Sequence, residues 1–359
     1  MLVCLLLAAA AADPFGFSQG TEPVDLSSDP DKSMWTSAEE CADCHEDVVA
    51  QWTTSRHRVA WTNDLMQAGF VAEPRMFCVH CHAPAAEQVA EIRRNLATYA
   101  ALGPHAPPHI APAPLAPEPM AEEGISCVVC HLRDGQMLSA DAAHPDSPHE
   151  VRVDPAFGSS AACTTCHDFP TPAFIDGTTH ISDEPMQATA QEWEAWKSLT
   201  GRTEDCPACH MPEGDHSMHG AHDRDRLTQS IVVTQAGSRL TLSTRDVGHA
   251  VPTGDLFRHL TVEARATGDP TWTTLDTLGR TFAVDASTVP PTKRQTADSR
   301  LHPGAPRVIE LPERFLGGRW RLRYHYGGPH DEARGLVPSE QLVAVVHQGS
   351  LPPPPTVTE

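Results

Sequence analysis

Hydrophobic and polar residues alternate along the chain in two different ways, and the change falls near residue 225. Before it, apolar positions recur in short runs at helical spacing. Residues 85–102 are the best example, because Val89, Ile92 and Leu96 share one face. A second helix is expected over residues 187–199. This pattern predicts a first part of short helices and loops with little regular structure.

After residue 225, apolar residues recur at every second position, which is typical of β-strands with one buried face. Two such runs, 231–233 and 240–242, flank Ala236-Gly237-Ser238 and predict a hairpin. Further strands are expected at residues 260–264, 280–284, 307–311, 319–326 and 342–347. About seven short strands with Gly and Pro turns indicate an antiparallel β-sandwich-like domain. The fold class is therefore predicted to be mixed.

The two ends of the chain differ from the rest in composition. The apolar run from Leu2 to Ala12 is 11 residues long, too short to span a membrane. It is typical of the end of a secretory signal, so residues 1–12 are expected to be removed and the protein exported. The expected divisions are a flexible leader at 13–33, a first domain at 34–224, a β-sandwich domain at 225–350 and a Pro-rich tail at 351–359.

Charge divides at the same boundary. Residues 1–224 hold 11 basic and 33 acidic side chains, and residues 225–359 hold 15 and 14. A net charge of -22 on the first part argues against nucleic acid as a partner, because phosphate recognition needs clustered Lys and Arg. It favours partner proteins with basic docking surfaces.

Cysteine spacing carries the strongest chemical signal. Apart from Cys4 in the predicted signal, all ten cysteines form C-x-x-C pairs, and His follows each pair directly. The five motifs are Cys41/Cys44/His45, Cys78/Cys81/His82, Cys127/Cys130/His131, Cys163/Cys166/His167 and Cys206/Cys209/His210.

C-x-x-C-H is the attachment signature of c-type heme. The two thiols form thioethers with the heme vinyl groups, and the adjacent His becomes the proximal iron ligand. Structural zinc uses two C-x-x-C pairs per metal and needs no His after each pair. A disulfide framework ignores the His as well. The sequence therefore predicts five covalently attached heme c groups, each with one iron.

The spacing of the motifs limits how the hemes pack. Residues 41–210 number 170, or 34 for each motif. A segment this short cannot enclose five porphyrins separately, and aromatic residues are only 6% of the chain. We therefore expect the hemes to contact one another and to form the core of the first domain.

The sequences around the motifs resemble the cytochrome c-554 family, which is related to hydroxylamine-oxidoreductase-type cytochromes. The resemblance covers residues 38–260. It is carried by four stretches: Trp52, Ser55, His57 and Ala60 after the first motif; Gly124-Ile-Ser before the third; Glu192-Trp193 with Met211-Pro212 around the fifth; and Gly248-His249-Ala-Val-Pro-Thr-Gly254. The resemblance implies that His57 ligates the iron of a neighbouring heme.

Fifteen histidines lie in residues 1–224, so distal ligands are available for bis-His irons with low potentials. The expected distal ligands are His57, His149, His216 and His249, and further candidates are His144 and His222. His216 is preferred over His219 and His222 by its position after the fifth motif. If His249 is a ligand, an iron bond joins the β domain to the first domain.

Three functions fit these features. The first is an electron carrier in an exported respiratory chain, in which electrons hop between closely packed, mostly bis-His hemes. The periplasm is the simplest location, and an extracellular or cell-surface location is the alternative. The second is a reductase or oxidase of small nitrogen or sulfur species at one open heme. The third is a heme relay and docking subunit of a larger membrane or outer-membrane redox complex. We favour the first, and no catalytic residue is assigned.

Overall fold

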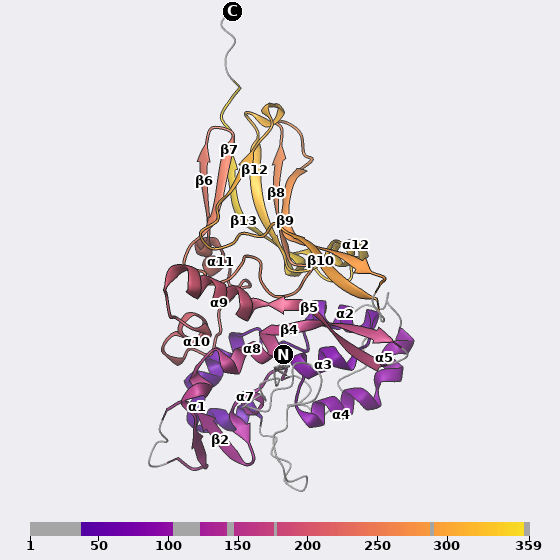
Figure 1. Ribbon diagram of the computed structural model, residues 1–359, viewed down its shortest axis with the longest axis vertical. Coiled ribbons are helices and arrows are strands. Elements are labelled where there is room, and N and C mark those ends of the chain that lie inside the picture. The colour runs from indigo at the N-terminus through magenta and orange to yellow at the C-terminus, as the bar shows by residue number, and fades with distance from the viewer. Residues whose placement is uncertain (1–36, 103–122, 142–146, 176–177, 288–290, 355–359) are drawn as a thin grey trace, which may run out of the picture.

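The computed structural model describes residues 37–102, 123–141, 147–175, 178–287 and 291–354. The predicted signal segment, the leader and His144 lie outside these ranges. The described chain has a mixed fold of helices and antiparallel sheets, as predicted. Figure 1 shows long strands at one end of the molecule and the helices that carry the cysteine motifs at the other. No helix in the described ranges is long and apolar enough to cross a membrane.

The N-terminal part, residues 37–223, has more regular structure than expected. Its helices are α1 (Ala38–Thr54), α2 (Asp64–Ala72), α3 (Met76–His82), α4 (Ala86–Arg94), α5 (Leu96–Leu102), α7 (Cys127–His131), α8 (Ala161–His167), α9 (Thr189–Thr200) and α10 (Cys206–His210). Its strands are β1 (Leu132–Arg133), β2 (Gln136–Ser139), β3 (Val151–Val153), β4 (Asp168–Ile175) and β5 (Thr178–Ala188). Strands β4 and β5 form an antiparallel ribbon that sequence periodicity did not predict.

The two predicted helices of this part need correction at their ends. Residues 85–102 form two helices, because Asn95 at the break donates from Nδ2 to the Glu91 carbonyl at 2.9 Å. Such side-chain bonds to the backbone compete with helix propagation. Helix α9 begins at Thr189, because the residues before it pair with β4. The Asp168 carboxylate then accepts the amide N–H groups of Ala190 and Gln191 at the helix start.

The C-terminal part contains two antiparallel sheets. One has the order β10-β9-β8-β12-β13 and the other β11-β7-β6. The strands are β6 (Ile231–Ala236), β7 (Arg239–Thr244), β8 (His259–Arg265), β9 (Thr273–Asp285), β10 (Thr292–Asp298), β11 (Arg307–Glu310), β12 (Arg319–His325) and β13 (Val343–Ser350). Short helices lie at α11 (Arg224–Ser230), α12 (Pro329–Arg334) and α13 (Ser339–Leu342).

The predicted hairpin at residues 231–244 is confirmed, and Gly237 at its turn has φ 63°. This left-handed backbone conformation favours glycine. The strict alternation at 319–324 is also confirmed, since Trp320, Leu322 and Tyr324 are buried. Strand β10 was not predicted, because its sequence, TKRQTAD, is polar throughout.

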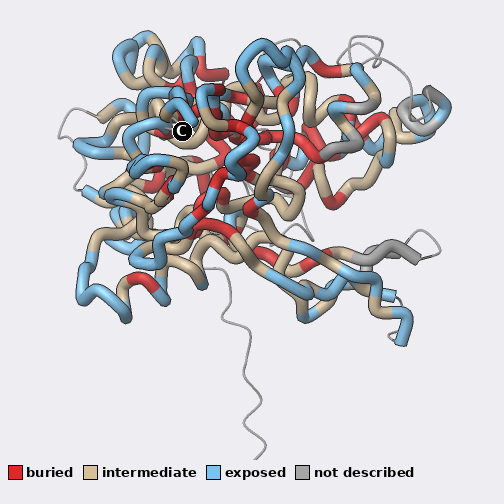
Figure 2. Tube along the Cα trace, turned by 90° about the horizontal axis from the view of Figure 1, so that it is seen from above, coloured by how far each residue is buried: buried red, intermediate tan, exposed pale blue. Residues whose placement is uncertain are grey.

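The apolar core lies mainly in the C-terminal part. Ile231 and Leu240 from one sheet, and Leu260 and Leu322 from the other, belong to one buried cluster. The N-terminal part has only smaller clusters, the larger of them around Phe70 and Val79. Figure 2 shows the buried segments gathered along the middle of the molecule, with exposed chain around them. Apolar side chains therefore fill the C-terminal part more completely than the N-terminal part.

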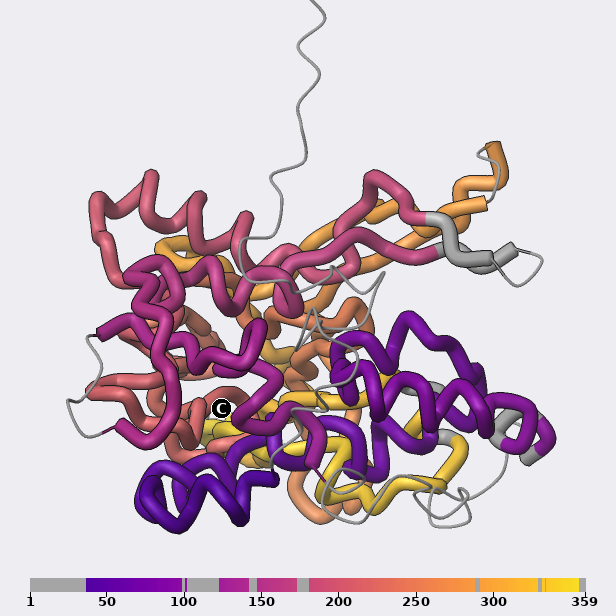
Figure 3. The backbone as a smooth tube through the Cα atoms, turned by 90° about the horizontal axis from the view of Figure 1, so that it is seen from below, coloured from indigo at the N-terminus to yellow at the C-terminus, as the bar shows by residue number. Residues whose placement is uncertain are grey.

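The β4–β5 ribbon contacts the C-terminal part. The Gln295 amide lies 3.5 Å from the Glu184 carboxylate, and the Arg280 guanidinium donates to the Pro185 carbonyl at 3.3 Å. Figure 3 shows this ribbon running beside the arm formed by β9 and β10. The two parts of the chain are thus joined along an edge as well as at the cavity described next.

Candidate functional site

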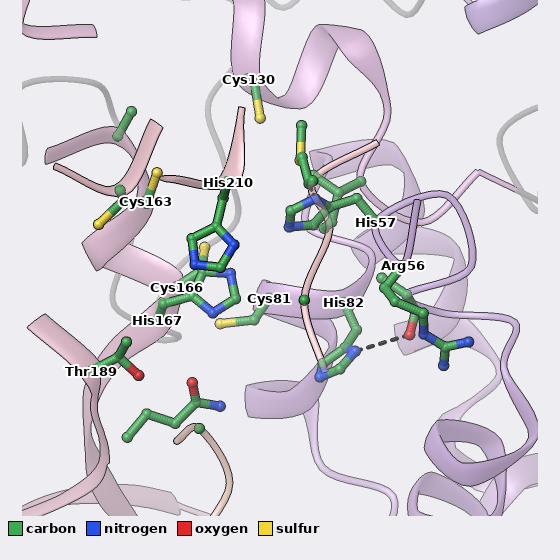
Figure 4. Close-up of a pocket in the computed structure, with 18 of the residues that line it drawn as sticks. Arg56, His57, Cys81, His82, Cys130, Cys163, Cys166, His167, Thr189 and His210 are labelled. Carbon is green, nitrogen blue, oxygen red and sulfur yellow. Dashed lines mark hydrogen bonds between the residues drawn. The ribbon is translucent and has the colours of Figure 1, made fainter. Parts of the chain in front are cut away.

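A cavity of about 1990 Å³ occupies the N-terminal part, and residues of the C-terminal part, among them 246–258, Tyr324 and Tyr326, also line it. Its volume is about twice that of the largest ordinary small-molecule pockets, which reach roughly 1,000 Å³. All ten motif cysteines and all five motif histidines line it. Figure 4 shows several of these side chains, from separate elements, pointing toward one another.

Each motif folds as a short helical segment whose end is the histidine. Helices α3, α7, α8 and α10 all stop at that residue, and α1 has non-helical angles at His45 (φ -122°, ψ 38°). Helical spacing of i and i+3 places the two cysteines of a motif on the same face. The local fold therefore presents two thiols and one imidazole to the cavity from each motif.

Backbone carbonyls orient these imidazoles. Nδ1 of His82 lies 2.9 Å from the Ala60 carbonyl, and Nδ1 of His131 lies 2.9 Å from the Leu138 carbonyl. Nδ1 of His210 lies 2.8 Å from the His219 carbonyl. A proton on Nδ1 leaves the Nε2 lone pair free for a metal, an arrangement that is usual for metal-bound histidine.

Four motif histidines each face a second histidine across the cavity. The ring centroids are 6.5 Å apart for His45 and His149, 6.1 Å for His57 and His167, 6.1 Å for His131 and His216, and 6.2 Å for His210 and His249. The second members are the four histidines that the sequence marked as expected distal ligands.

These spacings fit one iron between each pair. A metal–imidazole bond of about 2 Å on each side, with about 1.1 Å from each nitrogen to its ring centre, gives roughly 6.2 Å. Direct stacking of two rings would bring their centroids closer, as with His222 on Tyr326 at 4.2 Å. The residues present therefore fit iron held between two imidazoles at four positions.

Burial keeps several of these rings neutral. Burial, together with the neighbouring charges of His167, His82 and His210, lowers the pKa of His57 to about 3. Burial also lowers the pKa of His210 to about 4. The neutral imidazole is the form that binds a metal.

The other histidines singled out by sequence lie differently. No imidazole among the described residues faces His82 at the spacing of the four pairs. His222 lines the cavity, but its ring stacks on Tyr326 rather than facing a motif histidine. His219 contacts the carboxylate of Asp223 at 2.9 Å.

Three residues position His57. The indole of Trp52 donates to the Ile125 carbonyl at 2.8 Å, and the Ile125 amide donates to the His57 carbonyl at 2.9 Å. A Cβ at Gly124 would lie 2.7 Å from the same carbonyl, so only glycine permits this approach. Trp52, Gly124 and Ile125 thus hold His57 against the segment that precedes the third motif.

A buried ion pair positions His249. The Glu192 carboxylate accepts the Ala250 amide at 3.1 Å and the Thr253 hydroxyl at 2.8 Å, and it contacts the Arg300 guanidinium at 2.7 Å. Trp196 supports the same loop, because a Cβ at Gly248 would lie 3.0 Å from its indole. Glu192 of the N-terminal part therefore holds the loop that carries His249.

Replacing Glu192 with Ala is expected to loosen this loop. Removing the Glu192 carboxylate takes away the acceptor of the Ala250 amide and the Thr253 hydroxyl, whereas Arg300 keeps its contact with the Asp298 carboxylate at 2.6 Å. Hydrogen bonds to a charged group are worth about 1.5–3 kcal/mol each, so the expected cost is about 3 kcal/mol. Hydrogen exchange of the amides at 248–254 should report a local opening free energy lower by that amount. The matched control is Glu194→Ala on the same helix, whose exposed pair with Lys197 is worth well under about 1 kcal/mol. Equal exchange rates in the two variants would contradict the assignment.

Cysteines of different motifs also approach one another. The Cys41 thiol hydrogen-bonds with the Cys127 thiol, which lowers the pKa of Cys41 to about 7. The Cys206 thiol does the same with the Cys163 thiol, and its pKa is also lowered to about 7. Motif 1 therefore lies against motif 3, and motif 4 lies against motif 5.

Sequence reasoning missed a set of polar residues on the wall between the two parts. They are Arg56, Arg258, Tyr324 and Tyr326. The alternation at 319–326 predicted that Tyr324 would be buried, but not that it lines a cavity. No pattern singled out Arg258, which lies in an irregular loop before β8.

Comparison with known proteins supports the fold. No protein-family model and no curated protein sequence matches the chain. A solved structure that is similar is described as a penta-heme cytochrome c552 from Thermochromatium tepidum. The two are 21% identical, with a TM-score of 0.61, and the match covers 87% of this chain and 97% of that one. The chain therefore has a fold similar to that of this penta-heme cytochrome over most of its length.

Proposed function

We propose that the chain is a pentaheme c-type cytochrome that transfers electrons. The cysteines of the five motifs attach the hemes, and His45, His82, His131, His167 and His210 are the proximal iron ligands. The observation that carries the proposal is the set of four facing imidazole pairs with centroids 6.1–6.5 Å apart. His149, His57, His216 and His249 are then the distal ligands.

Bound heme would supply one-electron carriers whose iron has no free position at these four sites. The chain brings its attachment points together out of sequence order. Motif 1 contacts motif 3, and motif 4 contacts motif 5. Cys166 of motif 4 lies close enough to Cys130 of motif 3 that its charge, after burial, contributes to the raised pKa of Cys130. We infer that electrons pass by hopping along the order 1, 3, 4, 5, with motif 2 beside motif 4 because His82 lies near His57.

We further propose the domain division and location that the sequence indicated. Residues 34–224 form the heme domain, and residues 225–350 form a β-sandwich domain whose two sheets share one apolar core. Export follows from covalent heme attachment and the signal-like residues 1–12. The periplasm is the simplest location, and a membrane or outer-membrane redox complex is a candidate partner.

Electrons are proposed to enter or leave at motif 1. Its thiol Cys44 and its histidine are exposed, and five exposed carboxylates surround them on α1: Glu39, Glu40, Asp43, Glu46 and Asp47. Such a surface attracts cationic redox partners and raises their association rate.

Replacing these five carboxylates with the corresponding amides is expected to slow reduction by the cationic complex hexaammineruthenium(II) by about 10-fold at low salt. High salt should remove the difference, because a Debye length of about 3 Å at 1 M screens exposed charges. Stopped-flow absorbance measures the rates. A neutral reductant of similar potential serves as the control, and equal slowing of both would contradict steering.

A second function is favoured by the position of His82. Its Nδ1 faces the Ala60 carbonyl, and no described imidazole faces its other side. We propose as the alternative that the heme of Cys78 and Cys81 keeps one open axial position. The protein would then reduce or oxidise a small nitrogen or sulfur species there, with the other hemes as relays.

Electron paramagnetic resonance of the oxidised holoprotein, with heme quantified on the same sample, tests both proposals. Five hemes with only low-spin signals support the carrier. Four low-spin hemes and one high-spin heme that binds nitric oxide support the alternative. A chain that binds no covalent heme, or whose hemes are mostly high-spin, would contradict both.

A further inference from the structure

The wall between the two parts of the chain carries an arginine cluster, formed by Arg56, His222, Arg258, Tyr324 and Tyr326. Arg56 and His222 come from the N-terminal part, and the other three come from the C-terminal part. All five line the cavity that holds the cysteine motifs. This cluster has no role in the proposed attachment or ligation of the hemes.

Arg258 is the centre of the cluster. Its side chain is enclosed by protein, and its accessible surface faces the cavity. Within the described residues, its Nε is buried and has no hydrogen-bond partner. Gly254, with φ 88°, would place a Cβ only 3.4 Å from the guanidinium Nη1. The loop therefore packs against a cation that keeps one buried donor without a partner among the described residues.

Nearby protein groups balance this charge only in part. Asp255 is the carboxylate close to Arg258, and its Oδ1 already accepts the Gln187 side-chain amide at 2.9 Å. The Tyr324 hydroxyl hydrogen-bonds with the guanidinium but carries no charge. A buried cation without a full counter-ion costs several kcal/mol, so a further anion at this place would be strongly stabilised.

A second cation strengthens the same field. Burial lowers the pKa of Arg56. Arg258 lies close enough that its positive charge lowers this pKa further. His222 stays neutral, because burial lowers its pKa to about 3. The His222 ring stacks on Tyr326 with ring centroids 4.2 Å apart, and the Tyr326 hydroxyl donates a hydrogen bond to the Ala221 carbonyl at 2.7 Å. Both arginines line the cavity, Arg258 from inside the wall and Arg56 as an exposed residue at its edge.

We propose that Arg56 and Arg258 bind one carboxylate or similar small oxyanion within the cavity. Guanidinium groups suit this chemistry, because their paired N–H donors match two oxygens of one anion. The source of the anion is a heme propionate or a small anion from solution. This inference rests on the proposed heme content.

The position of the cluster indicates which heme is affected. Arg56 precedes His57 directly, and the charge of Arg258 acts on His167, which faces His57. Figure 4 shows Arg56 beside His57 and His82, and His167 on the other side of these two histidines. The heme of motif 4 is therefore the one whose potential should depend on this charge. Since Arg258 belongs to the C-terminal part, that part would set the potential of a heme that it does not attach.

Replacing Arg258 with Gln tests the inference. Loss of a cation beside a heme destabilises the reduced, more negative state, so one of the five redox transitions should shift to a more negative potential. Spectroelectrochemistry of the holoprotein measures the transitions. Arg258→Lys keeps the charge and should shift less, and Arg319→Gln removes an exposed arginine from the same part as a matched control.

Titrations with and without added acetate or inorganic phosphate separate the two sources. A propionate predicts that Arg258→Gln shifts one transition in every buffer, and that these anions change nothing in the wild type. A solution anion predicts that they shift one transition in the wild type and none in Arg258→Gln. A variant with five hemes whose transitions match the wild type in every buffer would overturn the inference. A wild type without covalent heme would instead overturn the proposed function.

Discussion

Replacing His57 with Ala should convert one heme of the five from low-spin to high-spin. His57 faces His167 at a centroid distance of 6.1 Å, and Trp52, Gly124 and Ile125 hold it there. No other described imidazole lies at that spacing from His167. An iron that loses its sixth ligand takes up a weak ligand such as water, and its spin state changes.

The spectrum should identify which heme has changed. The rings of His57 and His167 are inclined by 71°, whereas those of His210 and His249 are inclined by 8°. Nearly perpendicular and nearly parallel imidazoles give different low-spin resonance signals. His57→Ala should therefore remove the perpendicular type alone. His219→Ala, at an exposed histidine that faces no motif, is the control. An entirely low-spin spectrum in His57→Ala would show that the ligand is another residue.

Production of the chain without heme should leave the N-terminal part unfolded and the C-terminal part folded. The C-terminal sheets share a continuous apolar core that includes Leu240, Leu260 and Leu322, all fully buried. The N-terminal part instead surrounds a cavity of about 1990 Å³. Burial of apolar surface stabilises a fold by about 25 cal/mol per Å², and without heme the walls of this cavity have little to bury against.

Limited proteolysis with mass spectrometry measures this result. The expected product is a protected fragment that begins near residue 225, whereas the holoprotein should resist cleavage in both parts. Substituting both cysteines of motif 3 in the holoprotein removes only the heme between motifs 1 and 4 in the proposed order. This variant should show the same cleavage of the N-terminal part to a smaller extent. A heme-free chain that resists proteolysis throughout would show that the hemes are not its core.

Alternation of apolar and polar residues predicted the strands that have one buried face. The hairpin at 231–244 and the strand at 319–325 follow from alternation with one buried face. The β4–β5 ribbon was missed, because prolines at 170, 172 and 185 interrupt its pattern. Strand β10 was missed, because its residues are mostly accessible at the edge of a sheet and carry no apolar period.

The residues of the candidate site likewise separate into those found by local motifs and those that depend on contacts between distant segments. C-x-x-C-H is a local motif, so all fifteen attachment residues could be predicted from spacing alone. The partners of the motif histidines could be proposed as types but not paired, because pairing depends on contacts between distant segments. The arginine cluster could not be predicted from the sequence. Arg258 stands alone in an irregular loop without periodicity, and only the fold brings it next to Arg56 and the cavity.

The four imidazole pairs have a consequence for maturation. In three of them the partner lies well downstream of the motif, since His149, His216 and His249 follow motifs 1, 3 and 5. A chain that emerges from its N-terminus would therefore carry attached hemes before their second ligands have arrived. Such contacts between distant residues form late and slowly. Until the strands after residue 249 fold, the proposed heme of motif 5 would lack its second ligand, and its iron would be open to peroxide and other oxidants. The time during which the chain needs protection from oxidants would then depend on when each distal histidine folds into place.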